Sequence, residues 1–113
     1  MLFLVIIFAC VYYIYYSCIN VDVINQSGEK FTAAIIYKGG MSEKQVESGS
    51  GVRIRFRPQY TSSIDVEITS DHGKKVKTNL GAYIEKDFVG EIKVVVDEQF
   101  KAKVTDSNIR YMF

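Results

Sequence analysis

The sequence predicts an all-β fold, an antiparallel β-sandwich of the Ig-like kind or a small barrel, preceded by one N-terminal transmembrane or signal-anchor helix. Residues 1–19 form an apolar and aromatic run without a single charge. From residue 20 onward, apolar and polar residues alternate in short runs, and turn-forming residues separate these runs. The chain therefore divides into a membrane-inserted apolar segment, residues 1–19, and a β-sandwich domain, residues 20–113.

The N-terminal run has the length of a membrane segment. As a helix it would extend about 28 Å, close to the hydrocarbon thickness of a bilayer. So small a domain has no core in which to bury so many consecutive apolar residues. The tyrosines near its end suit the membrane interface, where rings are buried and hydroxyls reach water. The residues expected to anchor the protein are Leu2, Phe3, Leu4, Ile6, Ile7, Phe8, Val11, Tyr12, Tyr13, Tyr15 and Tyr16.

Two fates of this segment stay open. It is either an uncleaved single-pass anchor or a lipoprotein-type signal, in which Cys18 is lipidated. Ser17 fits the position before the lipidated cysteine, but Tyr15 replaces the usual aliphatic residue and no Lys or Arg precedes the run. The only other cysteine, Cys10, also lies in the apolar segment, so the β domain has no disulfide.

The orientation of the anchor is weakly specified. Lys30 and Lys38 follow the segment, which by the positive-inside rule favours a cytoplasmic domain. The predicted architecture is more common outside the cytoplasm, and the lack of disulfides is compatible with a bacterial envelope. We therefore expect a membrane-attached protein whose β domain is extracytoplasmic, in a bacterial periplasm or at the cell surface.

The β domain is predicted to contain seven to nine short strands. The run at 42–47 is polar apart from Val46, which suits a short edge strand. The expected strands lie at 21–23, 31–37, 42–47, 52–57, 63–69, 75–80, 88–96, 101–105 and 109–113.

Three arginines, Arg53, Arg55 and Arg57, occupy alternate positions in the stretch GVRIRFRP at residues 51–58. If the strand at 52–57 forms a hairpin with the strand at 63–69, one register places Arg55 opposite Asp65 and Arg53 opposite Glu67. The same register also pairs the apolar residues of the two strands. The arginine stripe is therefore predicted to be a solvated face on which the next strand compensates Arg53 and Arg55, while Arg57 falls opposite the neutral Ser63.

Charge and residue inventory argue against several function classes. Fourteen Lys and Arg face thirteen Asp and Glu, whereas a generic nucleic-acid binder needs a basic excess. His72 is the only histidine, and the domain has no cysteine, no Walker loop and no Gly-x-Ser-x-Gly elbow. We expect no enzymatic activity, no cofactor, no metal, no small-molecule substrate and no nucleic acid.

One short motif concerns modification. Asn25-Gln26-Ser27 matches the N-glycosylation sequon, which matters only in a eukaryotic secretory setting.

The function expected from these patterns is a non-enzymatic, membrane-anchored β domain that binds a protein partner at the cell envelope, in an immunity-like, inhibitor-like or adaptor role. Two alternatives stay open: a small accessory subunit of a membrane protein complex, and a basic surface at 53–57 and 74–77 for anionic lipid or nucleic acid. Loops displayed by a rigid sandwich are the usual binding sites. The candidate binding residues are Arg57, Tyr60, His72, Lys74, Lys75, Tyr111 and Phe113.

Overall fold

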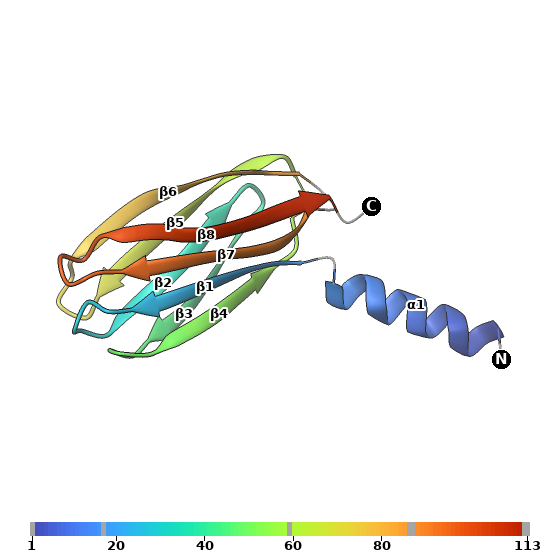
Figure 1. Ribbon diagram of the computed structural model, residues 1–113, viewed down its shortest axis with the longest axis horizontal. Helices are drawn as coiled ribbons and strands as arrows, with labels where there is room; N and C mark the ends of the chain where they lie inside the picture. The colour runs from blue at the N-terminus through green and yellow to red at the C-terminus, as the bar shows by residue number, and fades with distance from the viewer. Residues whose placement is uncertain (1, 17, 59, 86–87, 112–113) are drawn as a thin grey trace.

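The computed structural model describes residues 2–16, 18–58, 60–85 and 88–111, and it confirms a β-sandwich preceded by a helix (Figure 1). Two four-stranded sheets have the orders β4-β1-β7-β8 and β3-β2-β5-β6. The elements are α1 (Leu2–Tyr16), β1 (Ile19–Asn25), β2 (Phe31–Tyr37), β3 (Gly40–Val46), β4 (Gly51–Phe56), β5 (Ser62–Ser70), β6 (Lys75–Ile84), β7 (Phe88–Val96) and β8 (Ala102–Tyr111).

The core lies between the two sheets and follows from the period of two. Successive side chains of a strand point to opposite faces, so every second residue of β1 and of β5 is buried. The strand at 42–47 is confirmed as an edge strand, β3, and only its last residue, Val46, is fully buried. The largest fully buried side chains are Phe31, Phe100, Ile19, Ile35, Ile54, Ile64, Ile68, Ile84, Ile92, Val21, Val23 and Val46.

The expectation of a wholly antiparallel sandwich is wrong at one position, because β1 pairs with β7 in parallel. The chain leaves β1 for the other sheet, forms the β2–β3 hairpin there, and returns as β4 on one side of β1. A second excursion through β5 and β6 returns as β7 on the other side. The parallel pair follows from these two crossings, which no local pattern encodes.

The strands expected at 101–105 and 109–113 are joined, over Ala102–Tyr111, in one continuous strand, β8, and positions 112 and 113 lie outside the described residues. The register of β8 is irregular between Lys93 and Val94 of its neighbour. A bulge on an edge strand also hinders pairing with other chains. Gly90 of β7 has φ +140, and a Cβ atom there would overlap the Asn108 carbonyl oxygen of β8. The close approach of these two strands therefore requires glycine at position 90.

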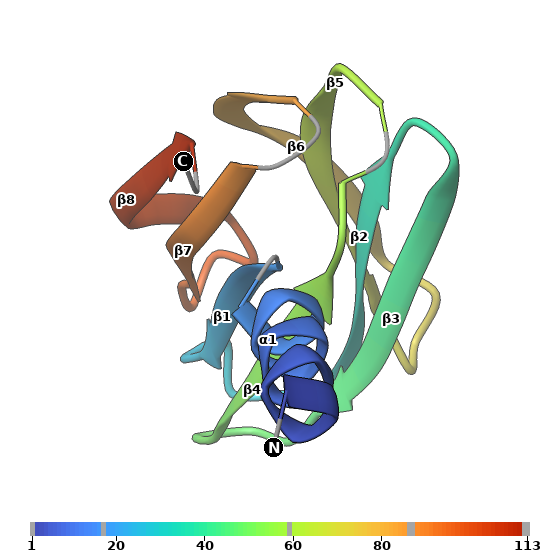
Figure 2. The ribbon, with the colours of Figure 1, turned by 90° about the vertical axis from the view of Figure 1, so that its right-hand side faces the viewer.

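The sandwich has two ends. The end that carries α1, named the helix end here, also carries the β2–β3 turn, the end of β4, the start of β5, the end of β6 and the end of β8 (Figures 1 and 2). The opposite end, named the far end, carries the turns that join β1 to β2, β3 to β4, β5 to β6 and β7 to β8 (Figure 1).

The expected transmembrane helix is not found. The helix ends at Tyr16 and has 15 residues, which corresponds to about 22 Å and is short of a hydrocarbon core of about 30 Å. In the described part of the chain, no helix is both long enough and apolar enough to cross a membrane. Ile19, assigned to the apolar segment on sequence grounds, is fully buried in β1, where it pairs with Phe56 and Gly90.

Candidate functional site

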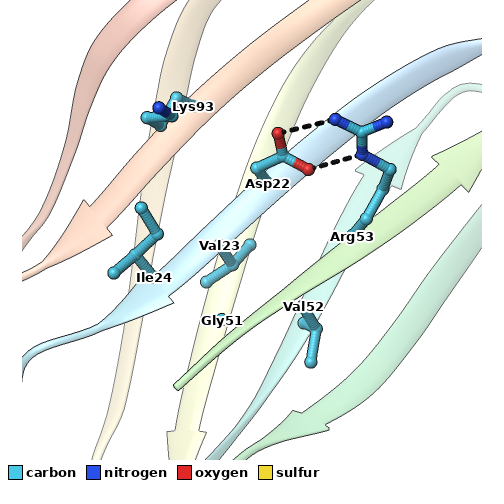
Figure 3. A pocket seen from close by; sticks show the side chains of 7 residues that line it. All are labelled: Asp22, Val23, Ile24, Gly51, Val52, Arg53 and Lys93. Atoms are coloured by element: carbon cyan, nitrogen blue, oxygen red, sulfur yellow. Dashed lines mark hydrogen bonds and ion pairs between the residues drawn. The ribbon is translucent and has the colours of Figure 1, made fainter. Parts of the chain in front are cut away.

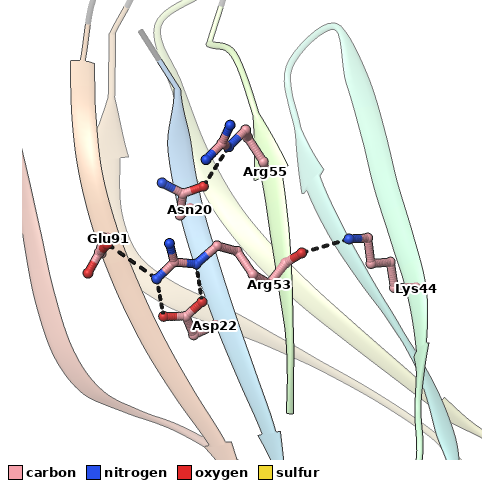
Figure 4. Close-up of polar contacts among 6 residues, drawn as sticks. All are labelled: Asn20, Asp22, Lys44, Arg53, Arg55 and Glu91. Carbon is pink, nitrogen blue, oxygen red and sulfur yellow. Dashed lines mark hydrogen bonds and ion pairs between the residues drawn. The ribbon is translucent and has the colours of Figure 1, made fainter. Parts of the chain in front are cut away.

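Arg53 of the arginine stripe is compensated by acidic residues, but the partners predicted for Arg53 and Arg55 are wrong. β4 pairs with β1, so Arg53 lies opposite Asp22 and Arg55 opposite Asn20. Arg53 donates from Nε to Asp22 Oδ1 over 2.7 Å and from Nη2 to Asp22 Oδ2 over 3.1 Å (Figure 4). Its Nη2 also lies 3.3 Å from Glu91 Oε1 of β7, and Arg55 Nε donates to Asn20 Oδ1 over 2.9 Å. Arg53 therefore belongs to an ion-pair network across β4, β1 and β7, whereas Arg55 is hydrogen-bonded to the neutral side chain of Asn20.

The acidic residues that were expected to face the arginines lie on the other sheet. Glu67 pairs with Lys75 over 3.2 Å, and Asp65 lies 3.9 Å from Lys77. Asp65 Oδ1 also accepts a hydrogen bond of 2.9 Å from Asn79 Nδ2. The basic group at 74–77 is thus partly neutralised by its own neighbouring strand, which weakens the interpretation of this group as a nucleic-acid or lipid surface.

A shallow, open depression lies over β1, β4 and β7 and is lined by Asp22, Val23, Ile24, Gly51, Val52, Arg53 and Lys93 (Figure 3). Asp22 and Arg53, two of its charged groups, are bonded to each other. The charged side chains of the depression are therefore partly engaged in the ion-pair network.

The candidate binding residues do not form one surface. Arg57 and Tyr60 lie at the helix end, between β4 and β5, and both are exposed. His72 and Lys74 lie in the β5–β6 turn at the far end, and Lys75 begins β6 there. Tyr111 ends β8 at the helix end. The side chain of Tyr111, and the whole of Phe113, lie outside the described residues.

At the helix end, the β2–β3 turn contacts the connection between β4 and β5 around Tyr60. The Lys38 N–H donates to Ser62 Oγ over 2.8 Å. The Tyr60 ring lies over the backbone of Gly39, where a Cβ atom would come within 2.9 Å of the ring. Lys38 Nζ stands 5.7 Å from the centroid of the same ring. Tyr60 is thus held in position although 54% of it is exposed.

The far end is built differently. Lys74 Nζ also stands over an aromatic ring, 5.0 Å from the centroid of Phe100, but Phe100 is only 2% exposed. Phe100 has φ +62 and packs edge-to-face against Phe31 with centroids 5.9 Å apart. Burial of the ring offsets the cost of the left-handed backbone conformation. The far end therefore encloses its aromatic residue, whereas the helix end exposes one.

The β7–β8 turn at the far end is closed by a carboxylate. Asp97 Oδ1 accepts hydrogen bonds from the Gln99 N–H over 2.9 Å and from the Lys101 N–H over 3.0 Å. The hydrogen bond from the Lys101 backbone lowers the pKa of Asp97 from its ordinary value of 3.8, and the Gln99 backbone and the Lys103 charge act in the same direction.

The predicted anchor residues whose side chains the structure describes are all exposed: Leu2, Phe3, Leu4, Ile6, Ile7, Phe8 and Val11. The helix extends away from the sandwich (Figure 1). The side chains of Tyr12, Tyr13, Tyr15 and Tyr16 lie outside the described part. Cys18 is half-buried directly before β1, and neither Cys10 nor Cys18 forms a disulfide. Lipidation of Cys18 stays a prediction.

The sequon asparagine is a structural residue. Asn25 is fully buried. Its Nδ2 donates to the Glu29 carbonyl over 2.7 Å and to the Val46 carbonyl over 3.1 Å, and its Oδ1 accepts from the Ser27 N–H and hydroxyl. Because both hydrogens of the amide are used inside the fold, folded Asn25 is closed to glycosylation.

Within the described residues, no three His, Cys, Asp or Glu side chains are grouped as a metal site requires. Comparison with protein families finds no family model that matches this chain, and comparison with curated proteins finds no significant match.

Proposed function

We propose that this protein is a non-enzymatic binding module that α1 attaches to a membrane. The observation that carries the proposal is the exposed apolar surface of α1. The described side chains on every side of the helix are apolar, and Leu2, Phe3 and Phe8 are exposed by 76%, 74% and 72%. A helix that is apolar all round is stable in contact with an apolar medium rather than with water. Partial insertion into a bilayer provides that medium without a full crossing.

The test is flotation of the full chain with neutral phosphatidylcholine vesicles. The wild type is expected to float with the vesicles. Leu4→Glu combined with Phe8→Glu is expected to weaken this association by about 50-fold or more, because charged groups are costly in hydrocarbon. The matched control is Gln26→Glu combined with Gln45→Glu, which adds the same charges to exposed positions of the sandwich. A wild type that stays with the soluble fraction would refute membrane attachment.

The partner that we propose is a protein bound at the far end. Insertion of α1 directs the helix end toward the bilayer and the far end away from it (Figure 1). The β5–β6 turn there displays His72 and Lys74 between two paired strands, and loops on a rigid sandwich are the usual binding positions. We propose an extracytoplasmic location for the sandwich, in a bacterial periplasm or at the cell surface.

A photo-crosslinking residue introduced at His72 in native membranes tests this partner. The expected result is one dominant adduct with a protein, and the same residue at Gln45 serves as the control. Adducts formed only from α1, with a membrane protein, would instead indicate an accessory subunit of a membrane complex.

A further inference from the structure

Exposed apolar side chains are distributed unevenly over the sandwich. Outside α1, the described large apolar residues that are exposed are Met41, Tyr60, Tyr83 and Val104. Three of these four lie at the helix end: Met41 at the start of β3, Tyr60 before β5 and Tyr83 near the end of β6. Tyr83 is 65% exposed. The far end, in contrast, buries Phe100. The aromatic surface of the sandwich thus gathers at the end from which α1 emerges.

Among the described residues of the helix end, cations outnumber acidic residues. Lys38, Arg57 and Arg110 are cations at the helix end, where Glu85 is the described acidic residue of the neighbouring strand ends. The far-end turns carry both signs side by side, with Asp71 next to His72 and Lys74, and Asp97 and Glu98 next to Lys101. The helix end therefore combines exposed tyrosines with cations.

The arrangement at the helix end is held by contacts between its connections. Tyr60 packs on Gly39, and Lys38 is joined to Ser62 through its N–H. Lys38 Nζ over the Tyr60 ring brings a cation and an aromatic ring to one position. Tyrosines at interface depth and cations at the phosphates are the residues that membrane interfaces favour.

We propose that the helix end is a second membrane contact, which lies against the headgroups of an anionic bilayer. Tyr60 and Tyr83 enter the interface beside α1, and Lys38 and Arg57 face lipid phosphates. This inference rests on the proposed membrane attachment through α1, and it adds that the sandwich stands on the membrane in a defined orientation with its far end outward.

The charge contribution is measured by titrating the full chain with vesicles that contain phosphatidylglycerol. Removal of two charges by Lys38→Gln with Arg57→Gln is expected to weaken binding by about 25-fold, or about fivefold for each charge. The matched control at the far end is Lys74→Gln with Lys101→Gln. It also removes two positive charges, one of which, on Lys74, stands over the ring of Phe100. This control is expected to bind like the wild type, and added salt is expected to remove the difference between the two variants.

The depth of the tyrosines is measured independently of charge. The sequence has no tryptophan, so Tyr60→Trp and Tyr83→Trp each create a single fluorescent probe in the full chain. Brominated phosphatidylcholine mixed with phosphatidylglycerol is expected to quench both probes. His72→Trp at the far end is the control and is expected to keep its fluorescence. Thermal unfolding of each variant in the absence of lipid shows that it is folded.

The outcomes separate the two proposals. Suppose that the wild type binds vesicles. Equal affinities of the two charge-removal variants would then overturn the headgroup contact and leave attachment through α1 intact. The absence of quenching at positions 60 and 83 would do the same. Loss of wild-type binding to every vesicle would overturn both. Quenching at 60 and 83 but not at 72, with the affinity loss confined to the helix end, supports the contact.

Discussion

At the scale of single residues, the Asp97 carboxylate closes the β7–β8 turn by accepting two backbone N–H groups. Its pKa is lower in the folded chain than its ordinary value, chiefly because of the Lys101 N–H. A carboxyl with a depressed folded pKa contributes stability that is fully present above its unfolded pKa and is lost as the pH falls through its folded pKa. We therefore predict that part of the acid sensitivity of this protein originates at Asp97.

The measurement is thermal unfolding of the wild type and of Asp97→Asn between about pH 7 and pH 2. The amide in this variant keeps an oxygen for the two N–H groups but does not titrate. The wild type is expected to be the more stable protein at neutral pH, and the difference is expected to vanish at the acid end. A difference that stays constant across this range would assign the effect to geometry rather than to charge.

At the scale of elements, the pairing of β4 with β1 predicts which charges are coupled. Arg53→Asp places an acid beside Asp22 and Glu91 and is expected to cost about 1 kcal/mol on this partly exposed face. Asp22→Arg added to it rebuilds the pair with reversed signs and is expected to recover most of that loss. A double-mutant cycle on the free energy of unfolding measures the coupling.

The control for this cycle is Arg55→Asp with Asp65→Arg. These residues belong to different sheets, so their coupling is expected to be zero within error. Coupling between 55 and 65, with none between 53 and 22, would contradict the observed sheet order and restore the hairpin that the sequence predicts.

At the scale of the whole molecule, the buried core cluster consists of residues from the strands and the β7–β8 turn, and it includes none of the α1 residues whose side chains are described, 2–11. A chain of residues 18–113 is therefore expected to fold cooperatively with a thermal midpoint near that of the full chain in detergent. A chain of residues 20–113 also loses Ile19, and the cavity is expected to cost about 2–5 kcal/mol. Ile19→Ala in the full chain is the matched variant. An unfolded 18–113 chain would show that α1 belongs to the core.

The sequence by itself determined the features that depend on local backbone geometry. Side chains alternate along any strand, so period two located nearly all the strands, and the polar run around Val46 identified the edge strand. An uncharged run marked the N-terminal helix. Alternation along the strand also placed the arginines: once Ile54 and Phe56 were assigned to the core, Arg53 and Arg55 had to lie on the solvated face.

Only the tertiary structure decided which strands pair. Asp65 and Glu67 match the arginine spacing as well as Asn20 and Asp22 do, and a local pattern cannot distinguish them. Pairing depends on how two inner faces pack together, which involves all strands at once. The same packing explains why Ile19, assigned to the apolar segment on sequence grounds, is the first residue of β1. It also brought Tyr60 and Tyr83, which are distant in sequence, to the end of the sandwich that bears the helix.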